Sequence, residues 1–459
     1  MKAHTIRLIA MLNAIWITMV LVALVVGATQ NKLDSVAKAV VDSASGAVTL
    51  AIGLVGIMAL FLGLMRVLQE GGLLRTVARW LKPIMVRLFP DVPAEHPAMS
   101  MMILNFTANM LGLANAATPF GLKAMNELDK LNKHKGIATN AMILFLAINT
   151  SNLALFPTGV IGLRASLGSN SPASIFLTTL LATAISTGVA IILTKLFIAF
   201  APAFAPTVPT VPDTIYVENV AKTVPDTIIT QQNQQVNEAT AIIEREPPKA
   251  STFNKLIGWI AVFAILATFS WAAYERSLYE GWSVALRSAF SNWMLLLLIA
   301  AFVLYGVIRG VKVYDAIVEG GKEGFTIALR IIPFLVAILV AVGMLRSSGA
   351  LDLFVNLLAP VTNFIGMPPE TLPMALLRPL SGSGAYGVAA ETMKNYGTDS
   401  LIGTIVSTMQ GSTETTFYVL AVYFGAVNVR NTRFTIMPCL LAEASGIIAS
   451  VWACRLILF

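Results

Sequence analysis

The stretch at residues 98–123, AMSMMILNFTANMLGLANAATPFGLK, is the most informative part of this 459-residue chain. It is apolar enough to enter a membrane, yet it contains three asparagines, two glycines and a proline. Irregular backbone at membrane depth survives only where protein buries it or where it lines a wet cavity. The stretch therefore predicts a hairpin or a broken helix rather than a simple lipid-facing span. A second stretch at residues 372–393, LPMALLRPLSGSGAYGVAAETM, predicts the same.

The chain around these two stretches has the composition of a membrane protein. It is 56% hydrophobic and 12% charged, with a mean hydropathy of +0.77, whereas roughly 25% charged residues are usual in soluble proteins. Nine apolar stretches approach the length that crosses a bilayer: residues 8–26, 48–65, 138–161, 175–200, 256–273, 293–308, 325–344, 401–427 and 434–459. We expect an all-α polytopic membrane protein. The first stretch is interpreted as an uncleaved helix, because its apolar run is too long for a signal peptide.

The positive charges set the expected orientation in the bilayer. The net charge is +7, but the lysines and arginines gather in loops beside the apolar stretches, which indicates membrane topology rather than nucleic-acid binding. A cytoplasmic amino terminus places the basic residues at 66–87 and 123–135 inside. The outside loops are then poorer in positive charge, and Arg164 is assigned to one of them. We expect no nucleic-acid partner.

The composition changes abruptly at residues 201–251, which are rich in Pro, Thr, Val, Gln and Asn. Such a segment predicts a flexible cytoplasmic linker. It divides the chain into two membrane halves, residues 1–200 and residues 252–459. The alternative function for the linker is a docking site for a partner protein.

The two halves share an order of features. In the first half Gly63, Leu64, Met65 and Arg66 precede an amphipathic stretch that ends in prolines, a polar hairpin and a span with a polar patch at residues 149–152. The second half repeats this order, beginning with Gly343, Met344, Leu345 and Arg346, and its patch lies at residues 410–414. In the expected topology the two repeats are inverted, each with a broken-helix or re-entrant hairpin. Inverted repeats with broken segments are typical of alternating-access transporters, and the alternative is chance similarity between apolar helices.

Polar residues of the first half form one side of the expected solute site. They are Asn105, Asn109, Asn115, Thr118, Asn149, Thr150, Ser151 and Asn152. Buried carboxamides need hydrogen-bond partners, and Gly112 and Pro119 permit a helix break that exposes backbone groups. The alternative is hydrogen bonding between helices, which is common among small residues in membranes.

The second half supplies the other side of the site. Its candidates are Arg378, Ser381, Ser383, Gln410, Ser412, Thr413 and Glu414. A buried arginine beside a flexible, donor-rich run suits an anionic group. The alternative is that Arg378 pairs with Glu391, Glu414 or Glu443, or that its side chain extends to the membrane surface.

Two acidic residues inside apolar spans, Glu414 and Glu443, are candidates for coupling to an ion. The oxygen-rich surroundings of Glu414 suit a hard cation, so sodium or a proton is the expected coupling ion, and the alternative is a structural ion pair. Cys439 and Cys454 are the only cysteines, and with three scattered histidines they form no metal-binding spacing. No phosphate loop, zinc-protease motif or nucleophile elbow occurs, so we expect neither an enzyme nor a resident cofactor or metal.

Certain runs resemble known families. The run from Asn109 to Gly121, NMLGLANAATPFG, resembles spore maturation protein A, whereas residues 378–387 and 410–414 resemble spore maturation protein B. The chain outside the linker therefore resembles a fusion of the two, with the A-like half first. Both families carry the gate, or nucleoside-recognition, domain, which is similar to parts of concentrative nucleoside carriers and bacterial ferrous-iron transporters. The resemblance implies a transport-like fold in the bacterial inner membrane, without naming a nucleoside as the substrate.

These observations together predict a secondary transporter that moves a small polar or anionic solute across the inner membrane. The solute would bind between the two hairpins, and the chain contacts the lipid bilayer and is compatible with a homo-oligomer. One alternative is a non-transporting scaffold that positions envelope or spore maturation enzymes through the linker. Another is a channel, in which flux would be uncoupled and poorly saturable.

Overall fold

The computed structural model describes residues 2–112, 114–200, 248, 251–282, 284–285, 288 and 293–459. Across these residues the secondary structure is helical, apart from a lone bridge between Ile137 and Asn431. Four described helices are long and apolar enough to cross a bilayer, and one pair bent by 81°, at residues 332–348 and 350–360, would make a fifth. The chain is therefore an all-α membrane protein, as predicted. The expected linker, apart from residues 248 and 251, lies outside the described residues.

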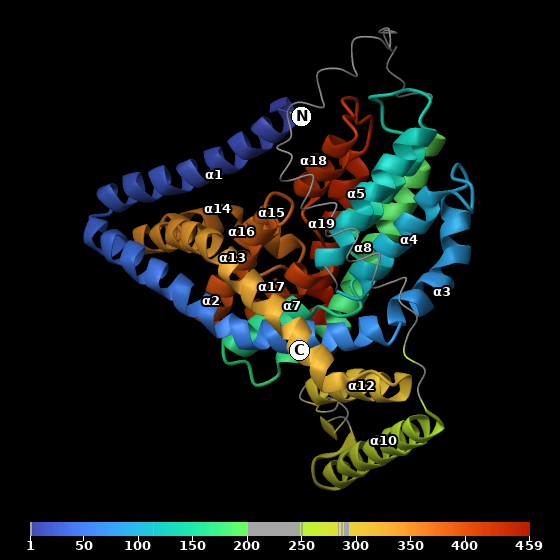
Figure 1. Ribbon diagram of the computed structural model, residues 1–459. Helices are drawn as coiled ribbons and strands as arrows, with labels where there is room; N and C mark the ends of the chain where they lie inside the picture. Colours follow the sequence, from blue (N-terminus) through green and yellow to red (C-terminus); the bar gives the residue numbers. More distant parts are fainter. Residues whose placement is uncertain are drawn as a thin grey trace.

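The first half runs from α1 to α8 (Figure 1). Its elements are α1 (Lys2–Thr29), α2 (Leu33–Glu70), α3 (Leu73–Leu88), α4 (Pro97–Met110), α5 (Ala114–Leu131), α6 (Asn140–Ser151), α7 (Thr158–Ser166), the short 3-10 helix η1 (Pro172–Ile175) and α8 (Phe176–Ala199). The hairpin expected at residues 98–123 is the pair α4 and α5. Gly112 lies in its turn with φ +71°, a conformation that favours glycine.

The second half runs from α10 to α19. Its elements are α10 (Thr252–Glu280), α12 (Met294–Arg309), α13 (Val313–Ser348), α14 (Ala350–Phe364), the short 3-10 helix η4 (Pro369–Thr371), α15 (Leu372–Leu377), α16 (Gly382–Tyr396), α17 (Leu401–Ser412), α18 (Thr416–Ala426) and α19 (Ile436–Ile457). The second predicted hairpin is the pair α15 and α16. Ser381 begins α16, because its side chain accepts a hydrogen bond from Gly384 N at 3.0 Å.

Two of the expected spans are broken inside their polar patches. The span at residues 138–161 is split between α6 and α7, where Asn152 adopts φ +43° and ends α6. The span at residues 401–427 is split between α17 and α18 by the extended Thr413. Asparagine tolerates the left-handed conformation better than most residues. The polar patches at residues 149–152 and 410–414 are therefore helix breaks, as the sequence indicated.

The two halves pack against each other through antiparallel helices. A Cβ atom built on Gly343 of α13 would lie 2.2 Å from Ser43 Oγ of α2, and one on Gly324 would lie 2.6 Å from Ala59 N. Positions that rise along α2 thus meet positions that fall along α13, and glycines let the two backbones approach closely. The same holds for α8 and α19, since Ser186 Oγ donates to Ala442 O at 2.8 Å and the Phe197 ring lies 5.7 Å from that of Phe434.

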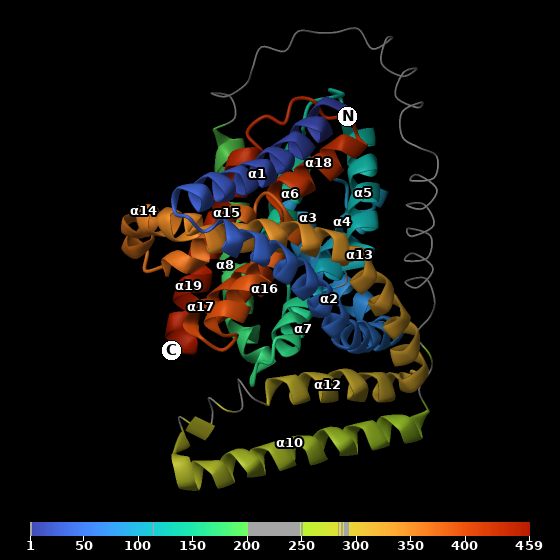
Figure 2. The ribbon, with the colours of Figure 1, turned by 90° about the vertical axis from the view of Figure 1, so that its left-hand side faces the viewer.

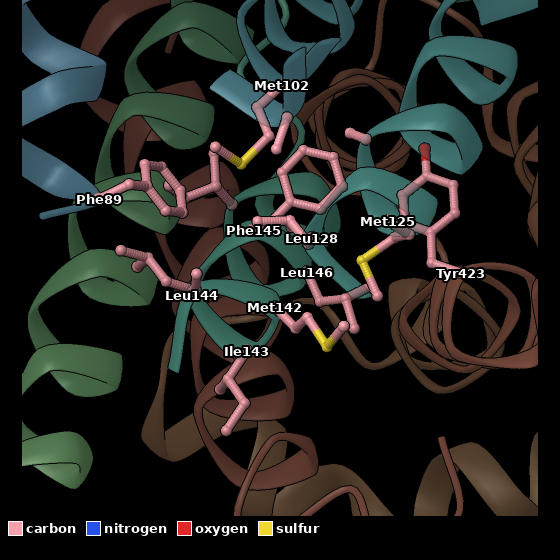
Figure 3. Close-up of a cluster of buried hydrophobic side chains, with 14 of the residues drawn as sticks. Phe89, Met102, Met125, Leu128, Met142, Ile143, Leu144, Phe145, Leu146 and Tyr423 are labelled. Carbon is pink, nitrogen blue, oxygen red and sulfur yellow. The ribbon is translucent and has the colours of Figure 1, made fainter. Parts of the chain in front are cut away.

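The hydrophobic cores also join the halves. Figure 3 shows Met102, Met142 and Phe145 of the first half in one buried cluster with Tyr423 of α18. The ring centroids of Phe145 and Tyr423 are 5.8 Å apart. Far from this core, α10 and α12 lie side by side at one end of the molecule (Figure 2), and Trp271 of α10 is an exposed apolar side chain suited to lipid. Unlike α10 and α12, the two helix breaks lie where the first and second halves contact each other.

Candidate functional site

The two helix breaks touch each other. Glu414 N, just after α17, donates a hydrogen bond to Thr150 O, in the last turn of α6, at 2.8 Å. The carbonyls at the end of a helix lack partners within that helix. One break therefore satisfies a backbone group of the other, and the predicted polar patches of both halves come together.

Each hairpin also docks on the break of its own half. Leu155 N, between α6 and α7, donates to Met110 O in the turn of the first hairpin at 2.8 Å. Phe417 N, at the start of α18, donates to Pro379 O in the turn of the second hairpin at 3.1 Å. The same contact thus recurs in both halves. Together with the bond between the breaks, it brings four predicted segments into one region.

Arg378 holds the end of α17 in place. Its side chain is 2% exposed, and its Nη2 donates to Gln410 O at 3.3 Å and to Thr413 O. Its Nη1 donates to Thr415 Oγ1 at 3.2 Å. A cation at a helix carboxyl end is favourable because the carbonyl dipoles point towards it. Of the three acidic residues considered as partners, Glu414 comes within 4.0 Å, at the limit of an ion pair.

The asparagines of the first half divide between two environments. Asn109 Nδ2 donates to Asn149 Oδ1 at 3.0 Å, which links the first hairpin to α6. Asn105 is fully buried, and its Nδ2 donates to Ala117 O at 2.7 Å and to the Tyr423 hydroxyl at 3.2 Å. The side chain of Asn115 lies outside the described part, and Thr118 is half-buried. Asn109 and Asn149 are thus next to the breaks, whereas Asn105 ties the first hairpin to α18.

Several hydroxyls of the predicted site hold helices together. Ser151 Oγ, at the end of α6, donates to Thr187 Oγ1 of α8 at 3.0 Å. Ser412 Oγ, at the end of α17, lies 3.1 Å from Ser450 Oγ of α19. Thr150 Oγ1 donates within α6, Asn152 O accepts from Thr183 Oγ1 and Ser383 is half-buried. The serine contacts match between the two halves.

Other polar atoms of the predicted site are buried without a hydrogen-bond partner among the described residues. They are Asn105 Oδ1, Arg378 Nε, Gln410 Oε1, Thr413 Oγ1 and Glu443 Oε1. An unsatisfied buried polar group costs roughly 1–3 kcal/mol, so each calls for a water, an ion or a ligand. Most of them belong to or contact residues 410–416, beside the second break.

The two acidic candidates differ in exposure. Glu443 is 1% exposed, and its Oε2 accepts from Thr416 Oγ1 at 2.5 Å. The side chain of Glu414 is 42% exposed, and its Oε1 accepts from Thr415 N at 3.1 Å. Among the described residues no group of three His, Cys, Asp or Glu side chains could hold a metal ion. Glu443 is thus the more deeply buried of the two.

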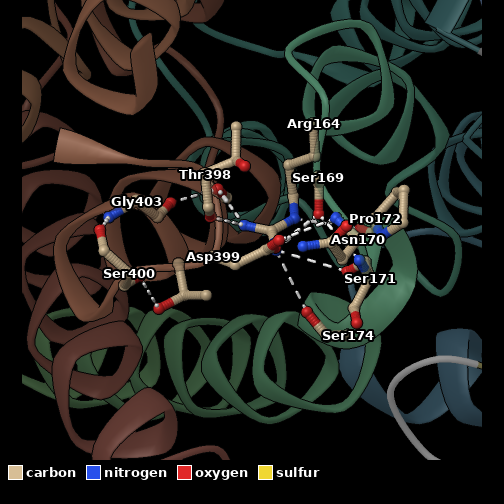
Figure 4. Close-up of polar contacts among 12 residues, drawn as sticks. Arg164, Ser169, Asn170, Ser171, Pro172, Ser174, Thr398, Asp399, Ser400 and Gly403 are labelled. Atoms are coloured by element: carbon tan, nitrogen blue, oxygen red, sulfur yellow. Dashed lines mark hydrogen bonds and ion pairs between the residues drawn. The ribbon is translucent and has the colours of Figure 1, made fainter. Parts of the chain in front are cut away.

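Arg164 does not lie in a loop, contrary to the expectation from the sequence. Arg164 lies in α7 with its side chain fully buried, and its Nη2 lies 2.8 Å from Asp399 Oδ1. Its Nη1 donates to Thr398 O at 2.7 Å and to Ser407 Oγ at 3.1 Å (Figure 4). The burial is tolerated because carbonyls, hydroxyls and a carboxylate replace water around the guanidinium. Because Asp399 follows 235 positions later, no local pattern relates the two residues.

Arg433 of the second half makes a corresponding contact with the first half. Arg433 Nη1, after α18, donates to Asn140 Oδ1 at 2.8 Å and to Ala138 O at 3.2 Å. Nearby, Asn431 N donates to Gly136 O at 3.0 Å. The loop after α18 therefore holds the loop before α6, just as Arg164 after the first break holds the loop before α17. We name these contacts the Arg164 latch and the Arg433 latch. In both ribbon views α18 lies near the top, whereas α7 lies lower, on the side of the molecule nearer to α12 (Figures 1 and 2).

Comparison with known proteins identifies the family. Residues 51–212 and 328–430 match the family described as Gate, nucleoside recognition. The chain belongs to the Gate family. The matched residues include both hairpins and both helix breaks.

The relatives of this Gate protein are membrane and sporulation proteins. It is 49% identical over 164 residues to spore maturation protein B of Bacillus subtilis, covering 35% of this chain and 92% of that protein. It is 41% identical over 187 residues to spore maturation protein A of Bacillus subtilis, covering 41% of this chain and 95% of that protein. Inner membrane protein YjiG of Escherichia coli is 35% identical over 80 residues, 17% of this chain and 52% of that protein. These matches agree with a fusion of A-like and B-like proteins, and no solved structure matches the chain.

Proposed function

We propose that this Gate protein is a secondary transporter of a small polar or anionic solute across the inner membrane. The observation that carries the proposal is the set of buried, unpartnered polar atoms where the two helix breaks meet, above all Gln410 Oε1 and Thr413 Oγ1. A bound solute would supply the missing hydrogen bonds. Nucleosides, amino acids or peptides derived from the cell wall, and phosphorylated solutes are the classes to consider.

The arrangement of the halves favours alternating access. We infer that residues 1–200 and 252–459 are inverted repeats, with the amino terminus and the linker on the cytoplasmic side. This inference is supported by the shared order of helices, by the antiparallel pairs α2 with α13 and α8 with α19, and by the matching contacts of Met110 and Pro379. Transporters of this kind bind solute at the repeat interface, where half-helices end.

The charged residues suggest separate roles within the site. Arg378 already holds the end of α17, so it acts mainly as a positioning residue, while its Nε stays available to an anionic group. Glu443 has one carboxylate oxygen without a partner in the described part. An acidic group inside the membrane is stable when a proton or cation accompanies it. Glu443, together with the more exposed Glu414, is therefore the proposed coupling group for a proton or sodium.

The two latches give the transporter its gates. The Arg164 latch closes one end of the repeat interface and the Arg433 latch closes the other, and both are formed here. A transport cycle would break one latch while keeping the other. Because each latch joins the two halves, rocking one half against the other would open a single end at a time.

A thermal-shift screen of the detergent-purified protein tests the proposal. The screen covers nucleosides, D- and L-amino acids, short peptides and phosphorylated solutes, with and without sodium and at acid and neutral pH. A solute that binds the folded state raises the unfolding midpoint in a saturable manner, and the Gln410→Leu variant should lose that response. If no compound shifts the midpoint, the scaffold function gains support, and deletion of residues 205–248 should then release a partner protein.

A further inference from the structure

In the part of the chain that the structure describes, Arg346 of the second half lacks the ion-pair partner that the arginine at the matching position of the first half, Arg66, has. Arg66 ends the run Gly63–Leu64–Met65–Arg66, and its Nε lies 3.1 Å from Glu70 Oε1, one turn along α2. Arg346 ends the matching run in α13, but the residue one turn later is Ala350. The Arg346 Nε is buried and has no hydrogen-bond partner among the described residues. The same position is therefore satisfied in one half and open in the other.

Arg346 faces a cavity of about 240 Å³ between α13, α14 and the second hairpin. Its guanidinium carbon lies 5.4 Å from the centre of the Tyr396 ring, which helps to hold the cation over the ring face. Two carboxylates, Asp352 and Glu370, also line the cavity. In the described part of the chain neither forms an ion pair with Arg346. Asn356 and Thr392 add polar groups to the lining, and aliphatic side chains complete it.

We propose that this cavity binds a small zwitterion, with its anionic group on Arg346 and its ammonium group on Asp352 and Glu370. An arginine and two carboxylates that share one cavity without pairing offer complementary charges to the two ends of such a molecule. The volume lies below the roughly 300–1,000 Å³ of pockets for drug-sized ligands, and it suits a molecule of amino-acid size. The same charges suit the headgroup of phosphatidylethanolamine, which also joins an anion to a primary ammonium.

The cavity is separate from the transport site. Its lining residues lie at positions 342–396 of the second half and include none of the residues proposed to bind or couple the transported solute. Failure of the transport proposal would therefore leave this inference standing, and the reverse is also true.

Binding of small charged probes to the purified full-length protein tests whether the cavity recognises both an anionic and an ammonium group. L-alanine and D-alanine are compared with propionate, which lacks the ammonium group, and with ethylamine, which lacks the carboxylate; phosphoethanolamine represents the lipid headgroup. We expect alanine or phosphoethanolamine to bind at least about tenfold more tightly than propionate or ethylamine, since a hydrogen bond to a charged group contributes about 1.5–3 kcal/mol. Preference for phosphoethanolamine over alanine assigns the site to lipid. Equal binding of propionate and alanine, or no binding of any probe, would overturn the proposal.

Variants locate the site and keep the test independent of folding. Arg346→Gln should weaken zwitterion binding at least about tenfold, whereas Arg66→Gln, at the matching position of the first half, should leave it unchanged. Asp352→Asn combined with Glu370→Gln should remove the preference for alanine over propionate. Asn356 is exposed at the cavity wall. In the Asn356→Cys variant, the cysteine should react with maleimide more slowly when a zwitterionic probe occupies the cavity. Unchanged labelling under saturating probe would place the ligand elsewhere and contradict the proposal.

Discussion

Replacing Thr413 by valine should stabilise the protein while weakening solute binding. Thr413 is fully buried, and its Oγ1 has no hydrogen-bond partner among the described residues. Valine has nearly the same shape but no hydroxyl. Because a desolvated hydroxyl without a partner costs roughly 1–3 kcal/mol, Thr413→Val should raise the free energy of unfolding of the solute-free protein by about 1 kcal/mol. The gain comes from removing a group that the fold does not satisfy.

The matched control is Thr408→Val, in the helix α17 that Thr413 ends. Thr408 is also fully buried, but its Oγ1 lies 2.9 Å from Thr178 Oγ1 and 3.2 Å from Cys454 Sγ. Its loss should lower the free energy of unfolding by about 1 kcal/mol. Thermal unfolding in mild detergent compares the two variants, and any stabilising solute from the screen should shift Thr413→Val less than wild type. If Thr413→Val destabilises as much as Thr408→Val, its hydroxyl has a partner in the fold and the argument for an unfilled site fails.

Three further changes test the packing, the latch and the linker. Gly324→Ala should lower the unfolding midpoint, because the new Cβ would lie 2.6 Å from Ala59 N. Gly56→Ala should raise the midpoint, because its new Cβ would have nothing within 4 Å and alanine favours a helix by about 1 kcal/mol over glycine. Arg164→Gln should cost about 3 kcal/mol of unfolding free energy, because it removes a buried guanidinium that binds carbonyls, hydroxyls and the partly exposed Asp399. Asp399→Asn should cost less, since the contacts of Arg164 with carbonyls remain, and equal losses would contradict the latch geometry. Deleting residues 205–248 should leave solute flux in proteoliposomes intact, and abolished flux would assign the linker a direct role.

The helix breaks were predictable because local chemistry determines them. Asn152 takes the left-handed conformation at the first break, and the polar patch at residues 410–414 ends α17. Gly112 likewise marks the turn of the first hairpin. At these positions polar residues interrupt an apolar helix. A few neighbouring residues in the sequence are enough to predict the interruption. The prediction of two hairpins and two broken spans therefore needed no long-range information.

The contacts within the site were not predictable in the same way. The sequence favoured an acidic partner or an anionic ligand for Arg378, but the guanidinium binds carbonyls at the end of α17. Arg164 counted as a loop charge, yet Asp399 and Thr398 of the other half bury it. Charge alone does not distinguish a solvated arginine from one that holds free carbonyls. That distinction depends on which loops the fold brings together.

Flux into proteoliposomes tests whether this Gate protein is a coupled transporter. The purified protein is reconstituted, a proton or sodium gradient is imposed, and uptake is measured for the compound that gives the strongest saturable shift in the thermal screen. We expect saturable uptake that depends on the gradient. Thr413→Val should reduce this uptake, and Glu443→Gln should make it independent of the gradient. Binding without any uptake, or uptake that neither saturates nor responds to a gradient, would contradict a coupled transporter whose site lies between the two helix breaks.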